Sequence, residues 1–411
     1  MSKDVCVIGL GYIGLPTSAL LANNGYQVFG VDINPDVVNI INQGGIHIVE
    51  PDLQEQVTIA IQSSKLKAYL EPQIADIYMI CVPTPFHETK NLEQQGCPVP
   101  NLEFVFSAVE SIVPLIKPGD IVILESTSPV GTTEMIGEII LRHNIDTNEI
   151  SIGYCPERVL PGKIMLELLS NDRIIGGLDE QSTLKISNFY KTFIQGRALE
   201  TNARTAEMCK LAENSYRDIN IAYANELSML SDNNGVDVWE LINLANHHPR
   251  VNILQPGAGV GGHCIAVDPW FLVSSDPTNA KLIQCARQIN DFKPHWVVQK
   301  ILLAAAEASK LGERKMKVAC LGLSFKPDID DLRGSPAISI AKNLQEAGVE
   351  VIAVEPNISA SKDFDLQSLE EALVNADLLV LLVAHREFTS SLVKSKLQQV
   401  RTLDFCGILD S

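Results

Sequence analysis

Short apolar runs alternate with helical patterns along the first part of the chain. Residues 4–8 form an apolar run that stops at a glycine-rich turn, and a helical pattern follows over residues 17–24. Further strand-like runs occupy residues 27–31, 77–82 and 121–125. Strands that alternate with helices predict βαβ units and therefore a parallel sheet.

The same order of elements returns near the end of the sequence. Residues 317–323, 351–355 and 378–383 match the strands that begin at residues 4, 27 and 77. Ser324 stands where the first part has Gly11. We therefore expect a second half that keeps the Rossmann-like fold but binds something other than a dinucleotide in the ordinary way.

A different pattern separates the two halves. Residues 203–233 form a long helical pattern without Gly or Pro, and a second helix is predicted over 237–245. A glycine-rich stretch at 256–263 and a helix over 294–311 follow, with a polar linker at 310–317. The predicted fold is α/β, with two doubly wound parallel-sheet domains joined by a long central helix and a helical segment. The expected domains are 1–200, 201–311 and 312–411.

Composition limits the possible partners. The chain has 411 residues, of which 46% are hydrophobic and 20% charged, as in globular proteins. Its net charge of −18 argues against nucleic acid as a partner. The nine scattered cysteines form no C-x-x-C pair, so we expect no zinc site and a reduced, cytoplasmic protein. The apolar runs are too short to span a membrane.

The first turn carries a dinucleotide-binding pattern. Gly9, Gly11 and Gly14 follow a strand and open a helix, as close approach of a backbone to a pyrophosphate requires. Asp32 ends the next strand and is placed to bond ribose hydroxyls and repel a 2′-phosphate, which favours NAD over NADP. The alternative is a glycine-rich turn that serves only packing.

Two further segments follow buried strands. Residues 81–85 and 125–129 lie at strand carboxyl ends, where a doubly wound sheet binds its ligand. Taken alone, each segment is more often a simple strand-ending turn than a binding site.

A second glycine-rich loop precedes a cysteine. Gly261 and Gly262 lead through His263 to Cys264, and Asp268 follows four residues later. A cysteine in a polar glycine-rich loop is a candidate nucleophile, whereas a lone cysteine is otherwise a small buried hydrophobe.

The long central helix carries a polar face. Lys210, Asn214 and Arg217 fall at i, i+4 and i+7. Two cations and an amide can hold an oxyanion and a phosphate, although a solvated polar face gives the same pattern.

Taken together, these motifs resemble the UDP-glucose/GDP-mannose dehydrogenase family over essentially the whole chain. The resemblance rests on motifs that occur in the family's order: the Gly9–Gly14 loop, Thr84, Thr127, Cys155-Pro156-Glu157-Arg158, Lys210 with Asn214, Gly261-Gly262-His263-Cys264 and Phe325-Lys326-Pro327-Asp328.

The resemblance implies a four-electron oxidation of a sugar C6 alcohol to a carboxylate, with two NAD per sugar. It implies that Cys264 captures the intermediate aldehyde as a thiohemiacetal, which becomes a thioester and is hydrolysed. Lys210 is the expected acid/base, helped by Asn214, while Asp268 and Glu157 are candidates to activate water. Thr127 is a further candidate to hold that water.

The resemblance also implies the binding residues. For NAD they are the glycines 9, 11 and 14 with Tyr12, Ile13, Asp32, Thr84, Thr127 and Arg333. For the UDP-sugar they are Arg158, Val159, Lys210, Asn214, Arg217, His248, Arg250, Gly261 and Lys326. A homodimer is implied, with Arg250 reaching the neighbouring subunit's site.

The substrate class follows from where the sequence departs from the UDP-glucose branch. That branch has Ser before the cysteine and Lys before the aspartate, whereas this chain has His263 and Val267. Residues 42–52, 154–162, 204–214 and 248–271 resemble the branch that oxidises UDP-N-acetylhexosamines. We expect UDP-N-acetyl-D-mannosamine as substrate, for a surface polysaccharide, with its C2 epimer UDP-N-acetyl-D-glucosamine as the alternative.

Two more distant functions stay open at this point. A two-electron hydroxyacid dehydrogenase shares the Rossmann start and the long central helix but leaves Cys264 idle. A non-enzymatic NAD-sensing module leaves Lys210, Asn214 and Cys264 unexplained.

Overall fold

The computed structural model describes residues 3–87, 97–262, 264–309 and 316–409. It divides into two compact units, Met1–Glu213 and Asn214–Ser411. The expected division at 1–200, 201–311 and 312–411 stays a prediction. Most of the expected linker at 310–317, like His263, lies outside the described residues. Among the described residues, no helix combines the length and the apolar character needed to cross a membrane.

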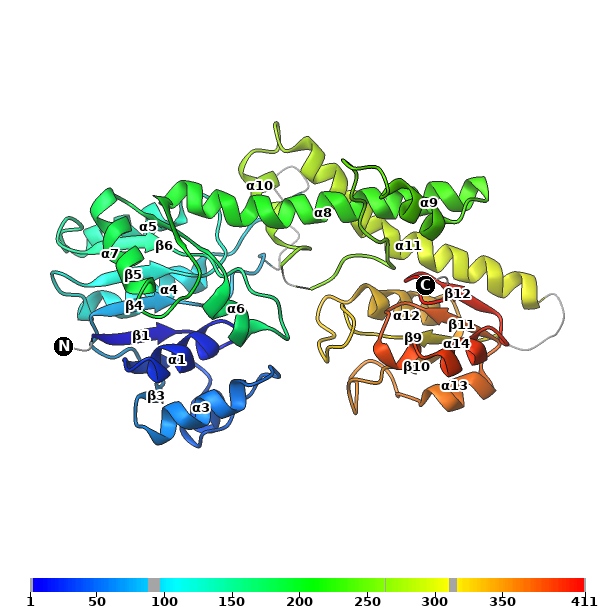
Figure 1. Ribbon diagram of the computed structural model, residues 1–411, viewed down its shortest axis with the longest axis horizontal. Helices are drawn as coiled ribbons and strands as arrows, with labels where there is room; N and C mark the ends of the chain where they lie inside the picture. The colour runs from blue at the N-terminus through cyan, green and yellow to red at the C-terminus, as the bar shows by residue number, and fades with distance from the viewer. Residues whose placement is uncertain (1–2, 88–96, 263, 310–315, 410–411) are drawn as a thin grey trace. The chain divides into compact units, whose positions relative to one another are not determined.

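In the described part of the first unit, eight strands form one sheet in the order β3-β2-β1-β4-β5-β6-β7-β8 (Figure 1). Their pairings are parallel except for the antiparallel pair β6–β7. The strands are β1 (Asp4–Ile8), β2 (Gln27–Val31), β3 (Leu66–Tyr69), β4 (Ile77–Ile80), β5 (Ile121–Leu124), β6 (Ser151–Tyr154), β7 (Arg173–Gly177) and β8 (Ala198–Asn202). The predicted parallel sheet is confirmed.

Helices cover both faces of this sheet. The helices are α1 (Gly14–Asn23), α2 (Pro35–Asn42), α3 (Leu53–Gln62), α4 (Glu103–Ile112), α5 (Thr132–Arg142), α6 (Ile164–Ser170) and α7 (Glu180–Tyr190), with a 3-10 turn η2 (Val113–Leu115). Val5 and Val7 point to the cluster formed with α1, α2, α3, α6 and α7, whereas Cys6 and Ile8 point to α4 and α5. This alternation is what a strand buried on both faces requires.

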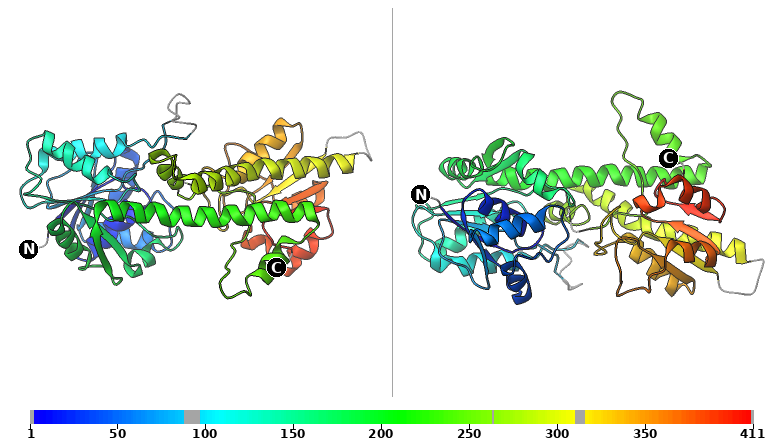
Figure 2. Two further views of the ribbon diagram at one scale, coloured as in Figure 1. Left: turned by 90° about the horizontal axis from the view of Figure 1, so that it is seen from above. Right: turned by 60° about the horizontal axis from the view of Figure 1, so that its bottom comes forward.

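The second unit combines long helices with a smaller sheet (Figures 1 and 2). α8 (Ala203–Asn234) runs into it from the first unit. The other elements are α9 (Val238–Ala245), α10 (Asp268–Ser275), α11 (Lys281–Ser309), β9 (Lys317–Leu321), α12 (Pro336–Glu346), β10 (Glu350–Val354), α13 (Leu369–Asn375), β11 (Leu378–Leu381), η3 (Arg386–Phe388), α14 (Ser391–Leu397) and β12 (Thr402–Asp404). In the described residues the sheet order is β10-β9-β11-β12, all parallel.

The two sheets repeat the same local geometry, as the matched sequence landmarks predict. Gly9 and Gly322 both have positive φ, +92° and +87°, and their N–H groups donate to the last residues of β2 and β10. The N–H of Asp4 donates to Asp76 at 2.9 Å, and that of Lys317 donates to Asp377 at 3.0 Å. The prediction of two Rossmann-like halves is therefore confirmed.

Some boundaries differ from the expected ones. α11 begins at Lys281 instead of Pro294, and the proline lies inside the helix. A proline within a helix removes one backbone hydrogen bond, yet α11 continues past Pro294 and packs on α10 and α12. The strands β3, β6, β7, β8 and β12 had not been predicted; β8 and β12 contain no fully buried residue, so their sequence pattern is weak.

Candidate active site

The first glycine turn leaves its backbone open to a ligand. A Cβ on Gly9 would lie 2.7 Å from the Cys81 carbonyl oxygen, and one on Gly14 would lie 1.7 Å from the Gly9 carbonyl oxygen. A Cβ on Gly11 would meet nothing within 4 Å. Gly9 and Gly14 are thus required by close packing, while Gly11 faces open space directly before α1. This is the arrangement that a pyrophosphate at a helix N-terminus needs.

Two backbone hydrogen bonds fix the side chain of Asp32, which directly follows β2. Its Oδ2 accepts the N–H of Leu10 at 3.1 Å, and its Oδ1 accepts the N–H of Asn34 at 2.9 Å. The side chain is half-buried, beside the turn that contains Tyr12 and Ile13. A carboxylate fixed by two backbone donors next to the glycine turn fits the ribose of a dinucleotide.

The two strand-end segments lie together. β4 and β5 are neighbours in the sheet, and the Thr84 hydroxyl donates to the Thr127 carbonyl at 2.6 Å. The expectation that residues 81–85 and 125–129 share one edge of the sheet is confirmed, because neighbouring parallel strands end on the same side.

Glu157 and Lys210 are joined by a hydrogen bond in the first unit. The Lys210 ammonium, on α8, donates to the Glu157 carbonyl oxygen at 2.6 Å, and the side chain of Lys210 is buried. The Glu157 carboxylate accepts the N–H of Val159. Burial raises the pKa of Glu157 to about 7 against the opposing attraction of Lys210 and Arg173. A carboxyl group with such a pKa exchanges protons readily near neutral pH.

Arg158 is already engaged. Its guanidinium binds Glu213 in a two-pronged contact, with Nε–Oε2 at 3.0 Å and an Nη2–Oε1 distance of 2.7 Å. It also donates to the carbonyl of Asp172 at 2.9 Å. A diphosphate bound by Arg158 would therefore compete with a carboxylate.

In the second unit, Cys264 is exposed and lies in the turn that leads into α10, four residues before its first residue. Its carbonyl accepts the N–H groups of Val267 and Asp268 at 3.0 and 2.9 Å, so the backbone turns tightly into the helix. The exposure excludes the small-buried-hydrophobe interpretation for Cys264. By contrast, Cys155 and Cys320 are buried, and burial raises the pKa of each thiol to about 12.

Asp268 and Asn214 are brought together. Asp268 is 3% exposed at the start of α10, and its Oδ2 accepts the Asn214 amide at 2.5 Å. Asn214 lies one turn of α8 from Lys210, as the i, i+4 spacing predicts. This hydrogen bond fixes the carboxylate of Asp268, which lies four residues after Cys264 in the same unit.

Gly261 and Gly262 are tightly packed. A Cβ on Gly261 would lie 2.5 Å from the Gly334 carbonyl oxygen and 2.6 Å from Pro336. A Cβ on Gly262 would lie 2.8 Å from the ring of Phe325. The segment that contains Lys326 and Arg333 therefore packs directly on the loop that leads to Cys264.

The remaining predicted residues are more exposed. Arg217, His248 and Arg250 are exposed, and the last two lie in the turns that follow α9. Lys326 is half-buried, and Arg333 binds Asp331 through both carboxylate oxygens at 2.9 and 2.7 Å.

Several polar residues around the site were not predicted. Asp218 and Asn225 continue the buried polar face of α8 beyond Asn214, and both are fully buried. Asp218 accepts Arg287 at 2.6 Å and Asn290 at 2.8 Å; Asn225 donates to Asn290 and accepts the N–H of Gly257, both at 2.9 Å. Polar residues repeated at helical spacing on α8 were the signal that could have found them.

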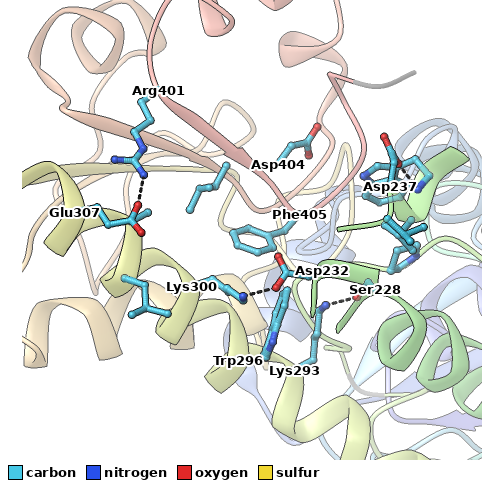
Figure 3. Close-up of a pocket in the computed structure, with 17 residues that line it drawn as sticks. Ser228, Asp232, Asp237, Lys293, Trp296, Lys300, Glu307, Arg401, Asp404 and Phe405 are labelled. Carbon is cyan, nitrogen blue, oxygen red and sulfur yellow. Dashed lines mark hydrogen bonds and ion pairs between the residues drawn. The ribbon is translucent and has the colours of Figure 1, made fainter. Parts of the chain in front are cut away.

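A pocket of about 510 Å³ lies elsewhere in the second unit (Figure 3). Among the described residues that line it, none is a predicted site residue. The buried Lys293 contacts Ser228 and lies 4.0 Å from the Trp296 ring centre, and burial lowers the pKa of this lysine to about 7. Lys300 and Arg401 are paired with Asp232 and Glu307.

Comparison with protein families gives three matches in chain order. The NAD binding domain of the UDP-glucose/GDP-mannose dehydrogenase family matches residues 3–194, its central domain matches 204–292, and its UDP binding domain matches 319–411.

Named relatives match nearly the whole chain. A UDP-N-acetyl-D-mannosamine dehydrogenase from Yersinia pestis is 51% identical over 404 residues, covering 94% of both chains. An NDP-N-acetyl-D-galactosaminuronic acid dehydrogenase from Ralstonia nicotianae is 48% identical over 421 residues, covering 99% of this chain and 96% of that protein. The solved structure of a UDP-D-ManNAc dehydrogenase from Pyrococcus horikoshii has a TM-score of 0.89 at 36% identity, covering 98% and 96%.

The packing at Gly261 predicts a sharp difference between two glycines of one loop. Gly261→Ala should lower the free energy of unfolding by about 1–3 kcal/mol and reduce turnover, because the methyl group must displace Gly334 or Pro336. Gly257→Ala is the matched control, since its Cβ would approach no atom closer than 3.9 Å. Thermal unfolding and steady-state rates check both variants. Equal behaviour of the two would show that the close contact is not a constraint.

Proposed function

Because the chain belongs to the UDP-glucose/GDP-mannose dehydrogenase family, we propose that it oxidises C6 of UDP-N-acetyl-D-mannosamine to the carboxylate with two NAD. The observation that carries the proposal is the position of Cys264, which is exposed four residues before Asp268, the first residue of α10. Relatives named for this sugar support the choice of substrate. UDP-N-acetyl-D-glucosamine, the C2 epimer, is the alternative.

The cofactor is NAD, and the first unit fits it. Gly11 faces open space, and the Asp32 carboxylate is fixed beside the glycine turn. When bound, NAD would supply the hydride acceptor for both oxidations at C6. We assign Tyr12, Ile13, Thr84, Thr127 and Arg333 to its binding as well. Asp32 would repel a 2′-phosphate, so NAD is preferred over NADP.

In the first oxidation the C6 alcohol loses a hydride and a proton and becomes an aldehyde. We assign to Lys210 the stabilisation of negative charge on the C6 oxygen as its proton leaves. The ammonium is fixed by the Glu157 carbonyl, so it needs little reorganisation at the moment of reaction. Asn214 assists from the next turn of α8.

In the second oxidation Cys264 provides covalent capture. Its thiolate adds to the aldehyde carbon and forms a thiohemiacetal, so the aldehyde is not released. Loss of a second hydride from that carbon, together with the proton of its hydroxyl group, gives a thioester. Water then attacks the thioester, the C–S bond breaks, and the uronate and the Cys264 thiol are produced.

The hydrolytic water needs a base. Glu157, whose pKa burial raises to about 7, is partly in its carboxylate form at neutral pH and is the first candidate. Asp268, fixed by Asn214, is the second. Thr127 is assigned a role in holding the water.

The substrate is a UDP-sugar, and local cations must bind its diphosphate because the chain carries a net charge of −18. We assign this to Arg158, Arg217 and Lys326. Val159, His248, Arg250 and Gly261 complete the proposed set with Lys210 and Asn214. We place the reaction in the cytoplasm, since the scattered cysteines have no disulfide spacing, and assign the uronate to a surface polysaccharide.

We further propose a homodimer. Tyr216, Tyr223 and Leu230 recur at seven-residue spacing on α8 and are 69%, 54% and 51% exposed. An exposed apolar stripe on a long helix is typical of a face that a second copy covers. Arg250 follows Pro249 in an exposed turn and would reach the neighbouring subunit's site.

The stoichiometry of the wild-type enzyme tests the proposed reaction. Two NADH should form per UDP-N-acetyl-D-mannosamine consumed, with no free aldehyde, and a lower rate is expected with UDP-N-acetyl-D-glucosamine. Cys264→Ala should abolish uronate formation and leave UDP-sugar binding nearly intact, because only covalent capture is lost. Cys285→Ala, at another exposed cysteine, is the control. Uronate formed at a normal rate by Cys264→Ala would contradict the thioester route.

The raised pKa of Glu157 predicts a pH dependence. The base form is lost as the pH falls through about 7, so kcat should decline towards about tenfold per pH unit below that value. Glu157→Gln should lower kcat and remove this decline. Rates measured with Glu157→Gln and Asp268→Asn across the same pH range distinguish the candidates. Loss of the decline in Asp268→Asn alone would transfer the role to Asp268.

Complementation tests the shared site. Arg250→Ala and Cys264→Ala chains should each be nearly inactive, yet in a mixed dimer the site with intact Cys264 receives the partner's intact arginine. Random mixing makes about half of the dimers mixed, each with one good site, so roughly a quarter of wild-type activity should return. Cys264→Ala mixed with Lys210→Ala is the control and should stay inactive, because both residues act in the site of their own chain. No recovery, with subunit exchange verified, would place Arg250 in its own chain's site.

A further inference from the structure

Glu355 occupies in the second sheet the position that Asp32 occupies in the first. It follows β10, and it accepts the N–H groups of Leu323 at 2.7 Å and Ser324 at 3.0 Å. It also accepts the N–H of Asn357 at 3.0 Å, as Asp32 accepts that of Asn34. The difference is burial, since Glu355 is 4% exposed whereas Asp32 is half-buried.

An internal imidazole takes the place of a ligand at Glu355. The fully buried His385 lies with Nε2 3.0 Å from the Glu355 carboxylate. Its Nδ1 accepts the N–H of Asp328 at 3.0 Å and faces the Asn357 amide at 2.9 Å. A backbone N–H can only donate, so Nδ1 of His385 is the acceptor of the Asp328 N–H. The ring hydrogen is therefore on Nε2, which donates it in a hydrogen bond to the Glu355 carboxylate. The equivalent of the ribose position is thus filled by the chain itself.

This arrangement leaves no imidazole lone pair for a cation. Asp328, His385 and Glu387 approach one another closely enough to hold a metal ion. The Nδ1 atom is already bound to a backbone donor, and the Asp328 carboxylate accepts the N–H of Arg386 at 2.9 Å. The cluster is explained by these hydrogen bonds, which fix the backbone.

The same two side chains hold both ends of the loop 323–328. At its start, Glu355 binds two successive N–H groups, and the Ser324 hydroxyl donates to the Lys326 carbonyl at 2.7 Å. At its end, His385 binds Asp328, which has φ +60°. A non-glycine residue in this left-handed region is costly and needs surrounding contacts to persist.

The hydrogen bonds that Glu355 accepts from the loop 323–328 depend on the ionised state of its carboxylate. Burial alone would raise its pKa, but hydrogen bonds from His385 and from the Leu323 and Asn357 N–H groups outweigh burial and lower it to about 2. The carboxylate therefore stays ionised at any pH at which the enzyme works, and charge-assisted hydrogen bonds to the loop remain strong.

We propose that Glu355 and His385 are positioning residues for the reaction, which hold the loop 323–328 so that Lys326 is presented to the UDP moiety. The loop's Phe325 ring packs on Gly262, so its position is also tied to the segment before Cys264. The inference rests on the proposed function, because Lys326 is assigned there to the UDP-sugar. Neither residue touches substrate in this role.

Substitutions at His385 separate the effect of its hydrogen bond to Glu355 from that of the hydrogen bond it accepts from Asp328. His385→Ala should raise the KM for the UDP-sugar and the Kd for UDP by about tenfold. The KM for NAD should change much less, since the glycine turn and Asp32 lie in the first unit and only Arg333 among the assigned NAD residues lies in the second. His385→Asn can place an amide oxygen where Nδ1 of His385 lies in the wild type, so it should recover most of the affinity for UDP. His385→Gln can reach Glu355 but not satisfy Asp328 in the same way, and should recover less.

Two further variants keep the test decisive. Leu397→Ala removes a fully buried side chain of the same unit outside the loop; it should lower the melting temperature without changing UDP affinity. If His385→Ala fails to fold, Ser324→Ala removes only a small side chain and should still weaken UDP binding about threefold. Loss of melting temperature in His385→Ala with unchanged UDP affinity, as in Leu397→Ala, would overturn the proposal.

The measurements distinguish this failure from failure of the proposed function. UDP titrations by calorimetry report on the loop without any turnover. A wild-type enzyme that binds UDP but oxidises no UDP-sugar would refute the proposed reaction and leave the positioning role testable. A wild-type enzyme that is active, with His385 variants that bind UDP normally, would refute only the positioning role.

Discussion

The buried ion pair between Asp218 and Arg287 is the contact on which the second unit depends. It joins α8 to α11 at 2.6 Å with both side chains almost completely buried. Removing Arg287 would leave the buried Asp218 carboxylate without its countercharge, which is far more costly than losing a surface pair. Arg287 itself also contacts Asp291. Asn290 and Asn225 extend the contact to the backbone of Gly257, so the loop that leads to Cys264 is connected to the helix that carries Asn214.

Charged and polar groups therefore fix the geometry at which chemistry is proposed, while apolar clusters supply the bulk of the stability. The sheets are held by buried aliphatic residues on both faces. Such packing tolerates rearrangement, whereas a hydrogen bond such as that between Asn214 and Asp268 fixes distance and direction. The environment of Glu157 likewise depends on specific charged neighbours. Burial raises its pKa to about 7 against the opposing attraction of Lys210 and Arg173.

The sequence was informative where a residue's role is local. The turns at Gly9 and Gly322, the strands before them and the helical spacing of Lys210 and Asn214 follow from nearby residues, and the structure agrees. The start of α11 was missed because Pro294 normally begins a helix, and only tertiary packing shows it inside one. The contacts of Arg158 with Glu213 and of Gly261 with Gly334 join residues more than fifty positions apart, so no local pattern reveals them.

The His385 imidazole beside Glu355 distinguishes the second sheet from the first, where, among the described residues, Asp32 has no such imidazole partner at its side chain. A glycine at Ser324 would not recreate the motif, because Pro327 stands at the position of Gly14. His385 would also still occupy the space beside Glu355. Removing His385 as well would leave a buried carboxylate without its partner. No single substitution therefore gives the second sheet the dinucleotide-binding features of the first, so the two sheets are not interchangeable as nucleotide sites.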